Sequence, residues 1–210
     1  MILEVNPFFP QPRRIARAVD VLRRGGLIAY PTDTVYAIGG ALAEPRVVKA
    51  IQRWKALGGS TTPPSIIADD LSTVASLAAV DNEAYKLIRR LTPGPYTFIL
   101  PAARLVPRKL LARTGRSVGV RLPAAPVVQA LVAALGGPLL TATAKGPDGE
   151  LLATPREVES AAKGFADLVL DAGPIEPVPS TVIDLTGEMP IVLRQGRGEI
   201  EWDEWGVLAS

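Results

Sequence analysis

The sequence of 210 residues contains neither cysteine nor histidine. Without cysteine the chain can form no disulfide and has no thiolate nucleophile. The lack of histidine excludes Ser-His-Asp and Cys-His catalysis as well as histidine-based zinc sites, and it leaves no side chain with an ordinary pKa near 7. An enzyme of this composition would have to act by positioning charged and hydrogen-bonding groups, and we predict no metal site built from protein ligands.

Aromatic residues are also scarce, at 5% of the chain, and no apolar run is long enough to cross a membrane. The first 24 residues are interrupted by Pro7, Pro10, Pro12 and several arginines, which is unlike a signal peptide or a membrane anchor. With 48% hydrophobic residues, the length favours one sizeable core. We therefore expect a single domain over residues 1–210, with its core at about 12–198, in a cytoplasmic protein that does not bind a membrane.

Acidic residues are absent from a long internal stretch. Between Ala84 and Pro147 there is no Asp or Glu but ten Lys or Arg, which leaves 13 basic and 21 acidic residues in the rest of the chain. A stretch in which every charged residue is basic favours an anionic partner, such as a phosphate-bearing ligand or a nucleic acid. The alternative is that folding disperses these charges among acidic residues from elsewhere.

Helical and extended patterns alternate along the chain. Apolar residues at helical spacing predict helices at 12–24, 45–57, 71–78, 82–91, 106–112, 125–135 and 155–163. Short apolar runs predict strands at 27–30, 65–68, 96–100, 118–122, 139–144, 168–170, 180–185 and 190–194. The pair Thr154 and Glu157 predicts a capping box at the start of the last helix. Because several strands near the C-terminus follow one another directly, the pattern predicts an α/β fold with a mixed sheet.

The segment 30–40, YPTDTVYAIGG, has a composition typical of a site. Pro31 removes a backbone donor, so the preceding strand should end there and a loop rich in hydroxyls should follow. Local turn hydrogen bonds alone explain such residues. In the alternative interpretation the loop is one wall of a ligand site, in which Thr34 contacts the ligand and Asp33 shapes the loop.

Hydroxyl and cationic side chains recur where other predicted strands begin or end. In open α/β sheets ligands bind beyond the strand ends, and such side chains suit a ligand that carries phosphate next to a carboxylate. The residues with this placement are Thr32, Thr34, Arg121, Thr141, Thr143, Lys145, Ser180 and Arg194.

The ordered succession of these motifs resembles the YrdC/YciO family of threonylcarbamoyl-AMP synthases, which prepare tRNA for N6-threonylcarbamoyladenosine modification. The form YTF at residues 96–98 is more similar to the YciO branch. The matching segments are YPTDTVY at 30–36, TPGPYTFIL at 92–100, VGVRLP at 118–123, PSTVID at 179–184 and LRQG at 193–196.

The resemblance implies a YrdC-like domain, in which a twisted mixed sheet flanked by helices bounds a large basic concave cavity. It also implies that ATP, accompanied by Mg²⁺, reacts there with L-threonine and bicarbonate to give threonylcarbamoyl-adenylate and pyrophosphate. An arginine can hold a carboxylate through two parallel hydrogen bonds, and hydroxyls can orient the ligand without changing protonation. Carried over residue by residue, the threonine-binding positions are Thr34, Arg121, Thr141 and Ser180, and the nucleotide-binding positions are Lys55, Ser117, Thr143 and Arg194.

The catalytic tetrad of the family falls on Arg53, Lys55, Thr143 and Lys145. The first two cations are exchanged relative to the family, and Lys145 replaces an asparagine, which both donates and accepts hydrogen bonds, by a residue that only donates. Two alternatives therefore stay open. One is a non-synthase paralogue of the YciO type that binds double-stranded RNA, tRNA or a nucleotide through the cavity, and the other is a related carbamoyl-transfer or nucleotide-hydrolysing activity. The sequence does not predict the oligomeric state.

Overall fold

The computed structural model describes residues 1–60, 62–104, 106, 110, 111 and 116–200. Within them, ten strands form one mixed sheet in the order β1-β8-β2-β3-β7-β4-β6-β5-β9-β10. The strands are β1 (Ile2–Glu4), β2 (Ile28–Pro31), β3 (Tyr36–Ala41), β4 (Ser65–Ile67), β5 (Tyr96–Pro101), β6 (Ser117–Arg121), β7 (Leu139–Thr143), β8 (Leu168–Asp171), β9 (Thr181–Asp184) and β10 (Ile191–Arg194).

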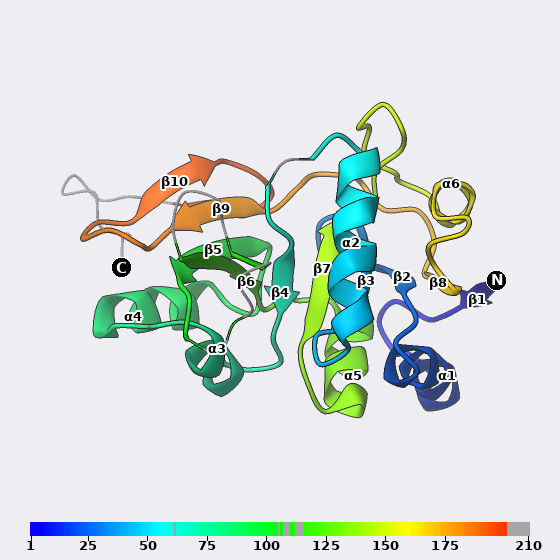
Figure 1. The fold of residues 1–210 in the computed structure, drawn as a ribbon, viewed down its shortest axis with the longest axis horizontal. Coiled ribbons are helices and arrows are strands. Elements are labelled where there is room, and N and C mark those ends of the chain that lie inside the picture. The colour runs from blue at the N-terminus through cyan, green and yellow to red at the C-terminus, as the bar shows by residue number, and fades with distance from the viewer. Residues whose placement is uncertain (61, 105, 107–109, 112–115, 201–210) are drawn as a thin grey trace.

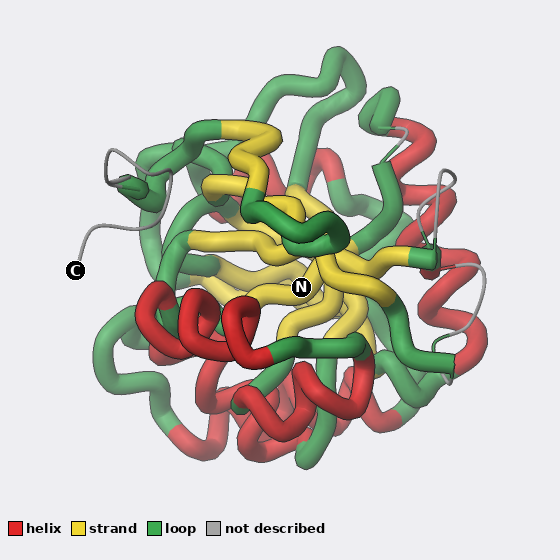
Figure 2. The backbone as a smooth tube through the Cα atoms, turned by 90° about the vertical axis from the view of Figure 1, so that its left-hand side faces the viewer, coloured by secondary structure: helices red, strands yellow, loops and turns green. Residues whose placement is uncertain are grey.

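Six helices are described, and they are distributed unevenly around the sheet. Most of them lie on one side of the strands, whereas the opposite side is occupied mainly by loops (Figures 1 and 2). This arrangement leaves part of one sheet face uncovered. The helices are α1 (Pro12–Arg23), α2 (Pro45–Leu57), α3 (Leu71–Leu77), α4 (Asn82–Leu91), α5 (Pro126–Leu135) and α6 (Pro155–Ala161).

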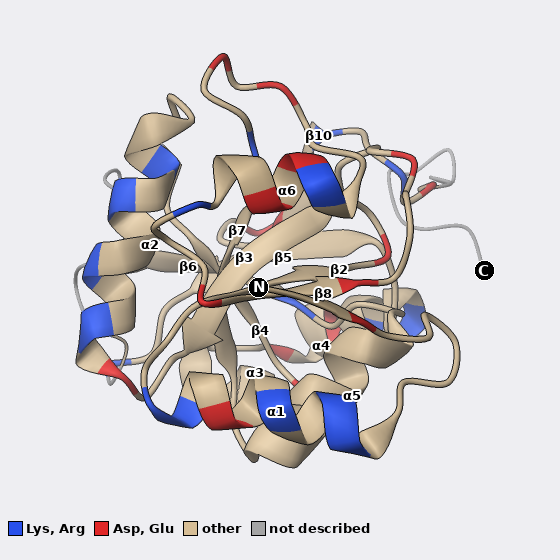
Figure 3. Cartoon of the chain, turned by 90° about the vertical axis from the view of Figure 1, so that its right-hand side faces the viewer, with Lys and Arg blue, Asp and Glu red and all other residues tan. Residues whose placement is uncertain are grey.

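The helix α2 follows directly from its sequence pattern. Its proline in the first turn needs no backbone donor, and its apolar stripe is buried against the sheet. Trp54 ends this stripe, and its indole Nε1 donates to the carbonyl of Thr143 on β7 at 3.0 Å. Lys and Arg residues recur along α2 (Figure 3), and Arg46, Lys49 and Arg53 among them are exposed. The helix therefore joins the sheet to a basic surface.

The capping box at the start of α6 is confirmed. The Thr154 hydroxyl accepts from the backbone N–H of Glu157, and the Glu157 carboxylate accepts from the backbone N–H of Thr154. These bonds lower the pKa of Glu157. They also satisfy two of the donors that a helix start leaves without partners.

The main error in the predicted elements concerns the segment 30–40, where a strand was not expected after Pro31. The chain instead turns over residues 32–35 and returns as β3, which pairs antiparallel with β2 and β7. Gly39 and Gly40 hide this strand in the sequence, because glycine is depleted in strands. Their small size has a packing reason, since a Cβ on Gly40 would lie 2.7 Å from the side chain of Val47 on α2. The strand β1 was not predicted either.

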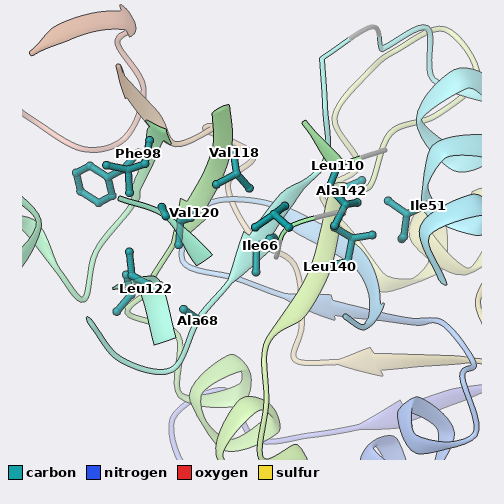
Figure 4. Close-up of a cluster of buried hydrophobic side chains, with 14 of the residues drawn as sticks. Ile51, Ile66, Ala68, Phe98, Leu110, Val118, Val120, Leu122, Leu140 and Ala142 are labelled. Carbon is teal, nitrogen blue, oxygen red and sulfur yellow. The ribbon is translucent and has the colours of Figure 1, made fainter. Parts of the chain in front are cut away.

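The core lies between the sheet and its helices. Alternate residues of β5 and β6, among them Phe98, Val118 and Val120, point into the cluster shown in Figure 4. Because side chains alternate along a strand, Thr97 and Ile99 on β5 and Gly119 on β6 point to the opposite face. The hydrophobic pattern that builds the core therefore also decides which residues line the open face.

The α/β fold class with a mixed sheet is confirmed. The predicted short helix at 106–112 lies largely outside the described residues. The described basic residues of the stretch without acids do not share one surface. Lys86 on α4 forms an ion pair with Glu83, and Arg89 lines a groove on the helical side, whereas Arg121 lines a cavity on the open side.

Candidate functional site

A cavity of about 440 Å³ occupies the open face of the sheet. Its described walls come from β3 to β7, β9, β10 and the end of α2, so strands far apart in the sequence meet there. Three cations and one carboxylate line it, together with many hydroxyls. The charged residues are Lys55, Arg121, Arg194 and Asp184, and the hydroxyl residues are Thr62, Ser65, Thr97, Ser117, Thr141, Thr143 and Ser180.

Arg121, the last residue of β6, is the central cation of the cavity. Its side chain is only 8% exposed, and its Nη2 donates to Oδ1 of Asp33 and to Oγ1 of Thr34, both at 2.9 Å. Burial lowers the pKa of Arg121, while Asp33 opposes that shift. The buried Nε has no hydrogen-bond partner in the described structure. Buried donors are normally satisfied, so this atom is an exception. Arg121 also lines the cavity, where its positive charge suits an anionic group.

Asp33 has a larger structural role than shaping its own loop. One carboxylate oxygen pairs with Arg121, and the other accepts from the backbone N–H of Ala124 at 2.8 Å. The same loop also contains local turn bonds, because the Thr32 hydroxyl donates to the carbonyl of Val35 at 2.6 Å. The local turn bonds of the first interpretation are therefore present, whereas ligand contact by this loop stays a prediction. Thr34 is 1% exposed and contacts Arg121, but it is not part of the cavity wall.

Two predicted hydroxyl residues line the cavity, and each is held by a second hydroxyl. The Thr141 hydroxyl on β7 accepts from the phenol of Tyr30 at 2.9 Å. The Ser180 hydroxyl lies 2.8 Å from Oγ1 of Thr97 on β5. All four residues are buried, so these hydroxyls are fixed in direction rather than free to rotate in solvent.

Arg194 and Ser117 also line the cavity as predicted. The Nε and Nη2 of Arg194 donate to the Ser180 carbonyl at 3.0 and 2.8 Å, so this guanidinium anchors the start of β9. Ser117 begins β6 on the same cavity face as Arg121. The two arginines therefore lie on opposite sides of Ser180 and Thr97, at the cavity's β5 to β10 end.

The predicted cations Lys55 and Lys145 meet at the other end of the cavity. Lys55 lines the cavity and shares a smaller hollow with Thr143 and Lys145. Burial lowers the pKa of Lys55 to about 8, and the charge of Lys145 adds to this shift. No acidic side chain lines this hollow among the described residues, and the Lys55 Nζ donates to Oγ1 of Thr62 at 3.3 Å. Two cations close together without an acid in this hollow are suited to the charge of a polyanion.

Arg53 is not brought together with the other predicted catalytic residues. It lies on the exposed side of α2, and its guanidinium carbon is 5.7 Å from the centre of the Phe165 ring. Lys55, two positions later, projects to the cavity because residues two apart on a helix do not share a face. The placement thus separates Arg53 from Lys55, the first two cations of the predicted tetrad.

Several residues of the site were not predicted from the sequence as functional. Tyr30, Thr97, Ser65 and Asp184 each line the cavity or bond a residue that does. The alternation of side chains along β5 could have indicated Thr97. This residue lies between two aromatic core residues, so its side chain must point to the opposite face of the sheet. No comparable signal existed for Tyr30, whose hydroxyl reaches the site from β2.

The described residues contain no helix that is both long enough and apolar enough to span a bilayer. They also contain no group of three or more acidic side chains placed to bind a metal ion.

The fold and the cavity define the class of protein: an α/β protein whose open sheet face carries a cavity lined by cations and hydroxyls. A family model named Sua5/YciO/YrdC, with the description "telomere recombination", matches residues 20–196. This chain belongs to the Sua5/YciO/YrdC family, which confirms the resemblance seen in its motifs.

Similar proteins with solved structures include the following two. The uncharacterized protein YciO of Escherichia coli is 38% identical over 200 residues, which cover 94% of this chain and 96% of that protein. Its crystal structure matches with a TM-score of 0.87 over 95% of this chain and 97% of the other. Pyrococcus abyssi Sua5, whose crystal structure was solved in complex with L-threonine, matches with 30% identity and a TM-score of 0.80 over 93% of this chain and 57% of the other.

The family includes threonylcarbamoyl-AMP synthases. One, from Chromobacterium violaceum, is 35% identical over 185 residues, which cover 85% of this chain and 92% of that protein. The chain is thus similar both to proteins named as synthases and to YciO, for which no activity is named.

Proposed function

We propose that this protein is a threonylcarbamoyl-AMP synthase-like enzyme that converts L-threonine, bicarbonate and ATP to threonylcarbamoyl-adenylate and pyrophosphate, for use in tRNA modification. The observation that carries the proposal is the guanidinium of Arg121, which lines the cavity together with the fixed hydroxyls of Thr141 and Ser180. A carboxylate is the group that a guanidinium edge binds best. The relative whose structure contains L-threonine supports an amino acid as the ligand.

The amino acid would lie between Arg121, Thr141 and Ser180. Thr34 would hold Arg121 in place by accepting a hydrogen bond from its Nη2. Arg121 takes the carboxylate, and the fixed hydroxyls orient the rest of the molecule. This arrangement requires no proton-shuttling side chain, which agrees with the absence of histidine. Such a site contributes to rate by holding the reacting amine in one orientation.

The nucleotide would extend toward the cations at the end of α2. Lys55, Lys145 and Thr143 suit the phosphate chain, and Ser117 and Arg194 suit the remainder of the nucleotide. Mg²⁺ would enter bound to the ATP phosphates. The threonine amine adds to the carbon of bicarbonate with loss of water, the resulting carbamate oxygen attacks the α-phosphorus, and pyrophosphate leaves. Cations near the phosphates stabilise the negative charge that develops in this step.

Pyrophosphate release should depend on L-threonine. The measurement incubates the protein with ATP, Mg²⁺ and bicarbonate, with and without L-threonine, and follows pyrophosphate and the adenylate product. A variant with Lys86→Ala on α4, which lies outside the cavity, should retain the activity. Pyrophosphate or phosphate release at the same rate without threonine would instead support a nucleotide-hydrolysing activity. No turnover, combined with RNA binding that weakens in salt, would support the RNA-binding alternative.

The affinity for ATP should decrease as the pH rises through about 8. The pKa of Lys55 in the free protein is about 8, so the ammonium is charged below this pH and neutral above it. Because phosphate binding favours the charged form, affinity is retained below pH 8 and falls above it, by up to about tenfold per pH unit if only the charged form binds. A titration between pH 7 and 9.5 measures this. Lys55→Arg keeps the charge throughout and should flatten the curve. A wild-type affinity that does not change with pH would show that Lys55 does not bind the phosphates.

A further inference from the structure

The phenol of Tyr30 contacts a residue of the cavity wall from β2, a strand that does not line the cavity. Tyr30 lies on β2 and is fully buried, and β3 separates it from Thr141 on β7. Its hydroxyl nevertheless lies 2.9 Å from the Thr141 hydroxyl. Gly39 makes this contact possible, because a Cβ at that position would lie 2.6 Å from the phenol oxygen. The missing side chain in the middle of β3 therefore gives the hydroxyl of Tyr30 its space.

The phenol is the donor of this hydrogen bond. Burial also raises the pKa of Tyr30 to about 12, so the phenol keeps its proton well above neutral pH. Its contact in the described structure is the Thr141 oxygen, which accepts that proton. A hydroxyl has one proton to donate, and Thr141 has no acceptor for its own proton among the described residues. Since Thr141 lines the cavity, its proton is available to water or to a ligand in the cavity.

The hydroxyl proton of Thr34, unlike that of Thr141, is used within the protein. The Thr32 hydroxyl donates its proton to the Val35 carbonyl, so Thr34 must be the donor in the 3.0 Å contact between these two hydroxyls. The oxygen of Thr34 then accepts from Arg121. Thr34 and Thr141, both predicted to bind the substrate, are thus not equivalent. Of these two hydroxyls, Thr141 is the one whose proton has no protein acceptor in the described part of the chain.

We infer that Tyr30 is a positioning residue, which holds Thr141 as a hydrogen-bond donor to an acceptor oxygen of the bound amino acid. This inference rests on the proposed function, because it takes L-threonine as the ligand. Removal of the phenol hydroxyl takes away the donor that fixes the orientation of the Thr141 hydroxyl, so its proton is no longer held toward the ligand. A single neutral hydrogen bond of this kind corresponds to a loss of about three- to tenfold in affinity.

The test compares Tyr30→Phe with Tyr36→Phe by calorimetric titration of L-threonine. Tyr36 is a matched control, because it is a fully buried tyrosine on the neighbouring strand whose pKa is likewise about 12, but its hydroxyl donates to the carbonyl of Gly173, away from the cavity. Tyr30→Phe should weaken L-threonine binding by about three- to tenfold, whereas Tyr36→Phe should leave it unchanged. Equal weakening by both variants would indicate a general loss of stability and overturn the inference.

A double-mutant cycle with Thr141→Val separates positioning from direct contact. If Tyr30 acts through Thr141, then Tyr30→Phe has no further effect on affinity in the Thr141→Val background. Fully additive effects, or wild-type affinity in Tyr30→Phe, would overturn the inference and leave the proposed function standing. If the wild-type protein does not bind L-threonine, the proposed function fails and the inference fails with it.

Discussion

Replacement of Arg121 by alanine should abolish the binding of L-threonine, with a loss of roughly 100-fold or more in affinity. Arg121 lines the cavity beside Thr141 and Ser180, so the change removes the cation that pairs with the carboxylate in the proposed complex. Calorimetric titration and the shift of the melting temperature at saturating L-threonine both measure this effect. Synthase activity should be lost in parallel.

Arg197→Ala is the matched control for this variant. Arg197 also has a buried Nε without a partner and also pairs with a carboxylate, that of Glu176, but it does not line the cavity. It should keep the affinity of the wild type. Because Arg121→Ala leaves Asp33 without its cation, the double variant with Asp33→Asn distinguishes loss of the ligand contact from loss of stability. Threonine binding near the wild-type level in both Arg121 variants would contradict the carboxylate assignment.

Asp33→Ala should lower the free energy of unfolding by about 3 to 5 kcal/mol. The ion pair with Arg121 is almost completely buried, with side chains that are 8% and 10% exposed, so the change leaves a buried guanidinium without its counter-charge. It also removes the acceptor for the backbone N–H of Ala124. Urea unfolding measures the difference, provided that the variant unfolds in one step.

Glu176→Ala is the control for this second experiment. Glu176 is 77% exposed in its pair with Arg197, so its removal should cost less than about 1 kcal/mol. Asp33→Ala combined with Arg121→Met should recover much of the lost stability, because both buried charges are then absent. A loss below about 1 kcal/mol for Asp33→Ala alone would show that the pair does not hold the loop to β6.

The helices and most strands could be predicted from local pattern. The α2 helix, with its stripe of Val47, Val48, Ile51 and Trp54, and the capping box of α6 depend on residues close in the sequence. The strand β3 could not be predicted in this way. Its two glycines are favourable only because Val47 and Tyr30 from other elements occupy the space of the missing side chains.

The candidate site was predicted in part. The motifs indicated Arg121, Thr141, Ser180, Lys55, Ser117, Thr143 and Arg194, and the structure places all of them on the wall of one cavity. Their roles stay predictions until the variants are measured. The motifs did not distinguish Arg53, which turns outward over Phe165, from Lys55 on the same helix.

The sequence by itself determined the α/β class, the family and the chemical character of the site. Local periodicity decides the elements, and the lack of cysteine and histidine limits the available chemistry to hydrogen bonds and charge. Only the tertiary structure decided how these groups meet. The strand order places β3 between β2 and β7, and β4 between β7 and β6. The contacts from Tyr30 to Thr141 and from Asp33 to Arg121 therefore join residues 111 and 88 positions apart. Such contacts depend on sheet register and burial, which no local stretch of sequence encodes.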